Sequence, residues 1–227
     1  MNTSTKVGIY NMALAAIGVS RFVNSVDEGT IETNTLNVFW DTVVDQVLQA
    51  FPWGFAMRYA LLQAITKTVP GWIYVYGCPS DSVQARLILP NLTGANGLTL
   101  SELALIAPGF QGIFPEFWAL WKTKKRIPFA IVEDETGGGL AICTNLSPAY
   151  LAYTARITTI QLWSPAFVNA LTWLLASKIV APLSASPVFA QTAGSAYQHA
   201  LLEAGALSMN EGVEKPEPES EFERARG

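Results

Sequence analysis

The clearest indications of this chain's fold lie in residues 150–187, YLAYTARITTIQLWSPAFVNALTWLLASKIVAPLSASP. Its opening residues, 150–157, alternate in the manner of a strand and are rich in aromatic and β-branched side chains. Ser164 and Pro165 then supply the N-cap and the first residue of a helix, and Ser186 with Pro187 begins a second helix in the same way. The stretch therefore predicts a strand that leads into two consecutive helices.

Each of these two helices is predicted to have one apolar face. The first is expected to stop before Pro182 and to bury residues at helical spacing, namely Phe167, Leu171, Leu174, Leu175 and Ile179. Gly205 is expected to end the second helix. The predicted inner face of the second helix consists of Phe189, Ala193, Ala196, Tyr197, Ala200 and Leu201. Its alanines would let a neighbouring helix approach closely.

Two further helices are predicted near the start of the chain. Residues 5–17 form the first, which Thr3, Ser4 or Thr5 can cap and Gly18 ends, with an inner face of Val7, Tyr10, Leu14 and Ile17. Residues 31–50 form the other, capped by Thr30 and ended by Pro52. Its inner face is predicted to be Leu36, Phe39, Trp40, Val43, Val47 and Ala50, with Asp41 and Asp45 on another side.

The region between these pairs of helices has the period of strands. Strands are predicted at residues 72–76, 84–89, 129–132, 140–144 and 150–157, and EDETGGG, residues 133–139, is predicted to be a hairpin turn. Residues 90–127 read as an irregular segment with a short helix at 116–122. So long an irregular segment in a compact domain is usually functional or interacting.

The predicted fold class is α+β: an antiparallel bundle of four main helices, interrupted by an inserted β-rich lobe and followed by an extended tail. The predicted boundaries are residues 1–57 and 163–207 for the helical body, 58–162 for the lobe and 208–227 for the acidic C-terminal tail. Residues 209–227 carry six glutamates against three basic residues, and such a segment cannot bury enough apolar area to order itself.

Composition favours a protein with large interfaces. Half of the residues are hydrophobic and 14% are charged, compared with about 25% in an average soluble protein. Apolar surface of this extent is typical of obligate oligomers. Membrane insertion is the rival explanation, but residues 162–183 contain Ser164, Asn169 and Lys178 and are bounded by prolines, so no membrane span is predicted. The N-terminus has no basic region followed by an apolar run, so no secretory signal is expected.

Enzyme motifs are missing from the sequence. His199 is the one histidine, and no GxSxG, HExxH or P-loop pattern occurs. Cys78 and Cys143 are interpreted as reduced core thiols, and no metal or cofactor is predicted. The densest carboxylates are Glu133, Asp134 and Glu135, with Asp81 elsewhere, but neighbouring carboxylates in a glycine-rich turn are expected to point apart.

One basic cluster, Lys122, Lys124, Lys125 and Arg126, follows an aromatic run that includes Trp118 and Trp121. Basic and aromatic residues together can hold nucleic acid, form a protein interface or lie in a solvated loop. Contact with a protein partner is favoured over the other two. The net charge of −4 argues against broad wrapping of nucleic acid.

Several segments together resemble the head-to-tail adaptor proteins of short-tailed bacteriophages, the tail tubular protein A type. They are ALAAIG (residues 13–18), NSVDEGT (24–30), AFPWGFA (50–56), WIYVYGCPSD (72–81), AYLAYTARIT (149–158) and LASKIVAPLSAS (175–186). They occur in the order found in the family and cover most of the chain except residues 90–127 and the tail. Each is mostly apolar patterning, so their joint order is the more specific signal.

The resemblance implies a structural virion protein and no enzyme. Members of the family form a ring, usually a dodecamer, between the portal at the capsid vertex and the tail nozzle, and the genomic DNA passes through the lumen. The resemblance places portal docking on the tail residues Glu214, Pro216, Pro218, Phe222, Arg224 and Arg226. A tail-side or neighbour interface is expected at Trp118, Trp121, Lys122, Lys124, Lys125 and Arg126. The implied location is the tail–portal vertex of the virion, after synthesis in the host cytoplasm.

Two alternatives from other classes are kept. A tail-associated glycan hydrolase would need carboxylates such as Asp81 or Glu133 in a cleft. A soluble nucleic-acid-binding module would use the basic cluster at residues 122–126.

Overall fold

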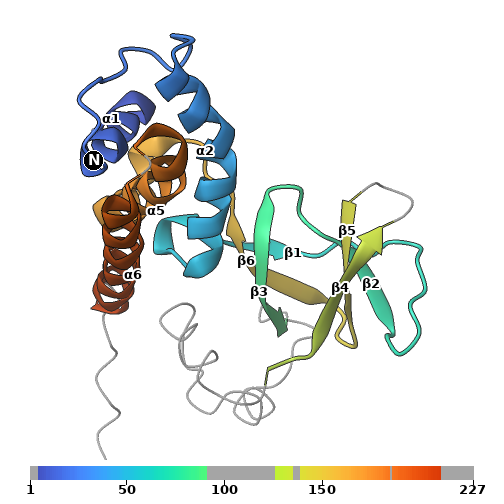
Figure 1. Cartoon of the computed structure of the whole chain (residues 1–227). Helices are drawn as coiled ribbons and strands as arrows, with labels where there is room; N and C mark the ends of the chain where they lie inside the picture. The colour runs from blue at the N-terminus through green and yellow to red at the C-terminus, as the bar shows by residue number, and fades with distance from the viewer. Residues whose placement is uncertain (1–4, 91–125, 135–138, 185, 211–227) are drawn as a thin grey trace, which may run out of the picture.

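The computed structural model of the protein describes residues 5–90, 126–134, 139–184 and 186–210, and within them the fold is α+β (Figure 1). The helices are α1 (Lys6–Ala16), α2 (Ile31–Ala50), α5 (Pro165–Leu183) and α6 (Pro187–Asn210). The strands are β1 (Met57–Leu61), β2 (Tyr74–Gly77), β3 (Ser82–Pro90), β4 (Phe129–Asp134), β5 (Gly139–Thr144) and β6 (Ala149–Ala155). All the strands therefore lie between α2 and α5 in the chain.

Helix starts follow the predicted capping residues. The hydroxyl of Thr5 accepts a hydrogen bond from the Gly8 amide at 3.0 Å, and Thr30 does the same for Thr33 at 3.2 Å. Ser164 caps α5 by accepting from the Phe167 amide at 3.2 Å. Each cap satisfies an amide that has no partner inside its helix, so a Ser or Thr just before an apolar run fixes where the helix begins.

The helix α5 is the centre of the helical part, because it contacts α1, α2 and α6. The five side chains predicted for its inner face are all buried: Phe167, Leu171, Leu174, Leu175 and Ile179. By length and composition α5 is also the one described helix that could cross a membrane. More than half of it is buried inside the protein, which is typical of the core helix of a soluble domain.

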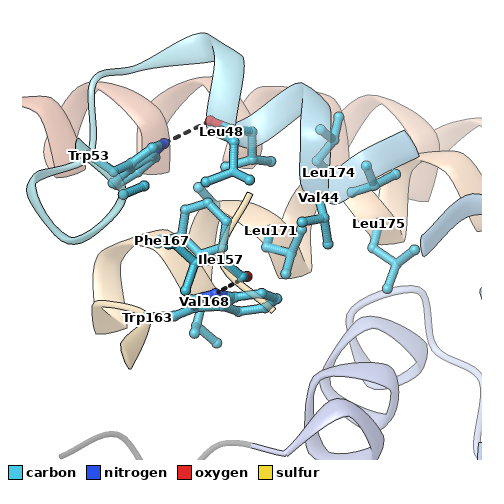
Figure 2. Packing of buried hydrophobic residues seen from close by; sticks show 14 of the residues in the cluster. Val44, Leu48, Trp53, Ile157, Trp163, Phe167, Val168, Leu171, Leu174 and Leu175 are labelled. Atoms are coloured by element: carbon cyan, nitrogen blue, oxygen red, sulfur yellow. Dashed lines mark hydrogen bonds between the residues drawn. The ribbon is translucent and has the colours of Figure 1, made fainter. Parts of the chain in front are cut away.

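A cluster of aromatic rings joins α5 to α2 and to the chain that follows α2 (Figure 2). Phe167 lies edge-on to both Trp53 and Trp163, with ring centroids 5.0 Å apart in each case, and Trp163 stacks on Trp40. The buried indole nitrogens have partners: Trp53 donates to the Val47 carbonyl at 2.7 Å and Trp163 to the Ile157 carbonyl at 3.0 Å. The rings thus bury a large apolar area without leaving a polar atom unpaired.

The strands form two antiparallel sheets, the first in the order β1-β6-β3 and the second in the order β2-β5-β4. One continuous segment links them. After β1 pairs with β6, the Leu62 amide bonds to Ala149, and then the carbonyl of Gln63 and the amide of Ile65 bond to Gly77 and Val75 on β2. The strands β4 and β5 pair antiparallel up to Asp134 and Gly139, as expected of a hairpin, and residues 135–138 of the predicted turn lie outside the described part of the chain.

Five strand predictions are confirmed with shifts at their ends, but β1 was not predicted. Its sequence, MRYAL, has exposed residues on both faces and follows the short 3-10 helix Gly54–Ala56. Its strand conformation comes from pairing with β6, whose residues are far away in the sequence. A local pattern cannot reveal a strand of this kind.

Helix predictions fail in four places. Gly205 does not end α6, which continues to Asn210, because the missing side chain makes room for Phe51: a Cβ at Gly205 would lie 3.3 Å from that ring. The helix α5 runs past Pro182 to Leu183, where the lost N–H falls in its final turn. Ala50 and Phe189 are exposed although both were assigned to inner faces, and the Phe189 ring lies instead beside the turn after α1, where a Cβ at Gly18 would be 3.0 Å from it.

Phe167→Ala is expected to lower the free energy of unfolding by about 3–5 kcal/mol, because it leaves a cavity between three aromatic rings. Phe22→Ala is the matched control, since Phe22 is exposed, and it should change stability by no more than about 0.5 kcal/mol. Urea titration followed by circular dichroism measures both. Equal effects of the two substitutions would contradict the central role of Phe167.

Candidate functional site

The predicted interface residues lie almost entirely outside the described part of the chain. This applies to the tail residues Glu214, Pro216, Pro218, Phe222, Arg224 and Arg226, and to Trp118, Trp121, Lys122, Lys124 and Lys125. The predicted helix at residues 116–122 and Glu135 are outside it as well. Arg126 is described and exposed, three residues before β4. The portal-docking and tail-side assignments therefore remain predictions.

The carboxylates considered for glycan hydrolysis do not come together as a pair. Glu133 and Asp134 are successive residues of β4, and successive side chains of a strand point to opposite faces. Asp81 is already engaged, because its Oδ1 accepts a hydrogen bond from Tyr153 at 3.0 Å and its Oδ2 forms an ion pair with Arg58. Nothing in this arrangement favours acid and base roles for these residues.

The most elaborate polar site is where the end of α2 meets the first sheet, and its centre is Arg86 of β3. This side chain is only 7% exposed. One of its nitrogens, Nη2, donates to the carbonyls of Leu48, Gln49 and Phe51 at 2.9–3.2 Å. Its Nε donates to the Thr154 hydroxyl on β6 at 2.9 Å. Arg86 thus ties the C-terminus of α2 to two strands.

The position of Arg86 suits its charge. The last carbonyls of a helix have no partners within the helix and carry the negative end of the helix dipole. The last turn of α2 contains no basic residue of its own, so β3 supplies the cation. Burial lowers the pKa of Arg86 to about 10, which still leaves the guanidinium charged at neutral pH.

A second arginine, Arg156, joins the end of β6 to the middle of α2. Its Nη2 lies 3.0 Å from Oδ1 of Asp41 and its Nε lies 3.1 Å from Oδ1 of Asp45. The Arg156 amide bonds to the Asp81 carbonyl at 2.8 Å, which fixes the backbone from which the side chain extends. The predicted spacing of Asp41 and Asp45 on one side of α2 therefore has a structural use: one arginine bridges both.

Within this bridge, Asp45 is the carboxylate whose negative charge is least well compensated. Its Oδ1 atom is buried and, within the described structure, has no hydrogen-bond partner, so Arg156 holds it by charge rather than by a well-aligned bond. Burial raises the pKa of the Asp45 carboxyl, Arg156 lowers it, and the negative charge of Asp41 raises it; the net shift is upward. The Asp45 carboxyl is therefore harder to ionise in the folded protein than an ordinary aspartate.

The two cysteines and the histidine are far from forming a reactive site. Cys143 is buried in β5 and Cys78 is partly buried after β2, and both are free thiols whose pKa values are raised by burial. His199 is exposed on α6. No group of three or more metal-ligating side chains occurs among the described residues. These positions provide no activated nucleophile within that part of the protein.

Arg86 and Arg156 together connect α2 to the first sheet, and we call this connection the joint. The sequence analysis did not identify either arginine, although the sequence contains a signal for both. Arg86 is the one charged residue of the apolar strand segment QARLIL, and Arg156 is the one charged residue of AYTARIT. A lone charge within an apolar strand has to find a buried partner or reach solvent. That rule marks the two residues, but it does not identify α2 as their partner.

Comparison with known proteins adds no assignment: no protein-family model matches the chain, and no curated protein matches it. The resemblance to head-to-tail adaptors therefore rests on the sequence segments quoted above.

Charge is scarce on three of the four described helices. The helices α1, α5 and α6 contain 11, 19 and 24 residues, 54 together, and their only Lys, Arg, Asp or Glu residues are Lys6, Lys178 and Glu203. An average soluble protein has about one charged residue in four. Large apolar side chains are nevertheless exposed on α1 and α6, among them Met12, Val188 and Leu202. This combination is typical of surface that is covered by another protein.

Arg86→Met is expected to lower the free energy of unfolding by about 2–3 kcal/mol, because three carbonyls and one hydroxyl lose a charged donor. Lys178→Met is the control, since Lys178 is an exposed cation on α5. It should cost no more than about 0.5 kcal/mol. Urea titration measures both, and an Arg86→Met variant as stable as the control would show that the joint does not stabilise the fold.

Asp45→Asn tests whether the ionised Asp45 carboxylate destabilises the folded protein, through the pH dependence of stability. Because the folded pKa is raised above the ordinary 3.8, ionised Asp45 destabilises the protein above that raised pKa, and this cost disappears as the pH falls toward 3.8. The variant should therefore be more stable than the wild type at pH 7, and the difference should shrink in acid. Thermal unfolding at a series of pH values measures it. A variant less stable at pH 7, or a gap independent of pH, would contradict the prediction.

Proposed function

We propose that this protein is the head-to-tail adaptor of a short-tailed bacteriophage, a structural protein whose copies form a ring between the portal and the tail nozzle. The observation that carries the proposal is that α1 and α6 contain only Lys6 and Glu203 as charged residues and expose apolar side chains such as Met12, Val188 and Leu202. Each subunit of a ring has two faces that are permanently covered by neighbours, and the core of such an interface is depleted in charged residues.

The order of elements supports the finer architecture expected of an adaptor. Two helices precede the strands and two follow them, and α5 packs against α1, α2 and α6. We propose that these helices form an antiparallel bundle and that residues 58–162 are a β-rich lobe inserted into it. The joint at Arg86 and Arg156 would then set the angle at which the lobe leaves the bundle.

The acidic C-terminus is proposed to dock onto the portal. Residues 211–227, which follow α6, contain six glutamates and three basic residues. A segment of this composition can wrap over a partner surface and fold as it binds. The genomic DNA is proposed to pass through the lumen without being held, since a chain with a net charge of −4 neutralises few phosphates.

The decisive experiment combines the purified full-length chain with purified portal protein. Light scattering coupled to gel filtration should find a closed oligomer, alone or once portal is added, and negative-stain images should show rings stacked on the portal. A chain that stays monomeric and does not bind portal would overturn the proposal. Glycan cleavage by the isolated protein would instead favour the hydrolase alternative, for which the described carboxylates offer no support.

Deletion of residues 211–227 is expected to leave the fold intact and to weaken binding to portal, because the deleted segment follows the last described helix. Circular dichroism checks the fold, and co-sedimentation with portal measures binding. A full-length variant with all six tail glutamates changed to Gln is the matched control that separates the charge of the tail from its presence. Unchanged portal binding by the truncated protein would rule out the docking role.

A further inference from the structure

The helix α6 leaves large aliphatic side chains in solvent. The residues that it buries fully are small: Ala193, Ala200 and Ala204. Tyr197 and Leu201 are partly buried against the core, but Leu202 is 75% exposed and Val188 68% exposed. In an ordinary amphipathic helix the large apolar residues face the core. The helix α6 therefore turns only part of its large apolar surface toward the protein.

The exposed residues form one continuous stripe. Val188, Thr192, Ser195, His199, Leu202 and Ala206 are spaced alternately by four and three residues and all are exposed; we call them the outer face of α6. Residues at this spacing lie along one side of a helix. Figure 1 shows α6 at the edge of the helical part, and α5 is its main packing partner, so the outer face lies opposite its contact with the protein.

Two polar residues of the outer face are already satisfied by their own helix. The Thr192 hydroxyl donates to the Val188 carbonyl at 2.9 Å, and the Ser195 hydroxyl donates to the Thr192 carbonyl at 3.0 Å. Burying a hydroxyl is costly when its hydrogen bonds to water are lost without replacement. Because these donors have internal partners, the outer face can be covered by apolar groups at a low cost. It is also free of charged residues, since Glu203 is not one of its members.

We infer that the outer face of α6 is the surface through which one copy of this chain contacts the next. The charge of the candidate partners favours a second copy over the chain's own C-terminal segment. The 17 residues 211–227 that follow α6 carry nine charged residues and would bring them onto a neutral surface. A second copy instead offers α1, whose only charged residue is Lys6 and on which Met12 is exposed, and a further uncharged α6 face. Obligate contacts between identical subunits are apolar in this way.

Leu202→Glu is the primary test, because the residue is exposed and its substitution does not disturb the core. It should raise the protein concentration needed for assembly by at least about tenfold, since a charge would have to be buried. Ile73→Glu is the matched control: Ile73 is 71% exposed but precedes β2, so assembly should be unchanged. Light scattering across a concentration series measures both, and circular dichroism checks that they fold. Leu202→Gln replaces Leu202→Glu if the charged variant does not fold.

A second measurement does not depend on weakening the contact. Cysteine introduced as Ser195→Cys should react with a maleimide much more slowly in the assembled full-length protein than in the same protein carrying Leu202→Glu. Equal labelling rates, or a Leu202→Glu protein that assembles like the wild type, would overturn the inference, as would a wild-type chain that stays monomeric.

This inference rests on the proposed function in one respect: both require copies of the chain to associate with one another. Rings that bind portal and are insensitive to Leu202→Glu would leave the adaptor proposal standing and remove the α6 contact. An oligomer that dissociates on Leu202→Glu but does not bind portal would support the α6 contact and remove the adaptor proposal.

Discussion

The interaction on which the described structure depends is the contact of the Arg86 guanidinium with the last carbonyls of α2. A helix that ends against a sheet has to satisfy those carbonyls away from bulk water, and α2 has no basic residue in its last turn to do so. A strand therefore supplies the donor, and the same side chain reaches Thr154 on the neighbouring strand. Helix and sheet are held at this point by directed bonds, which fix an orientation more tightly than apolar packing does.

The second arginine, Arg156, contributes ion pairs to this joint rather than hydrogen bonds to carbonyls. Arg156 bridges Asp41 and Asp45, and one of these carboxylates is partly desolvated and incompletely bonded. The Asp41 side chain is 81% exposed and that of Arg156 is 39% exposed, and ion pairs as exposed as this contribute little to stability. Together with Arg86, Arg156 ties α2 to β3 and to the residue that follows β6, at two separate points.

The sequence was a good guide wherever local chemistry decides the outcome. The caps Thr5, Thr30 and Ser164 and the apolar face of α5 are local features, and their predictions are confirmed. It was a poor guide where a distant partner decides: β1 forms because β6 is beside it, and Gly205 lies within a helix because Phe51 needs the space. The arginines of the joint belong to the second kind. The expected docking residues lie in segments that the structure does not describe.

The close approach of Gly205 and Phe51 has a mechanical consequence. The Phe51 ring lies against α6 at Gly205, while the Phe51 carbonyl accepts a hydrogen bond from Arg86. One residue is therefore the meeting point of the last helix, the end of α2 and the first sheet. Any displacement of α6 at Gly205 would therefore press on the same residue whose carbonyl the Arg86 guanidinium holds.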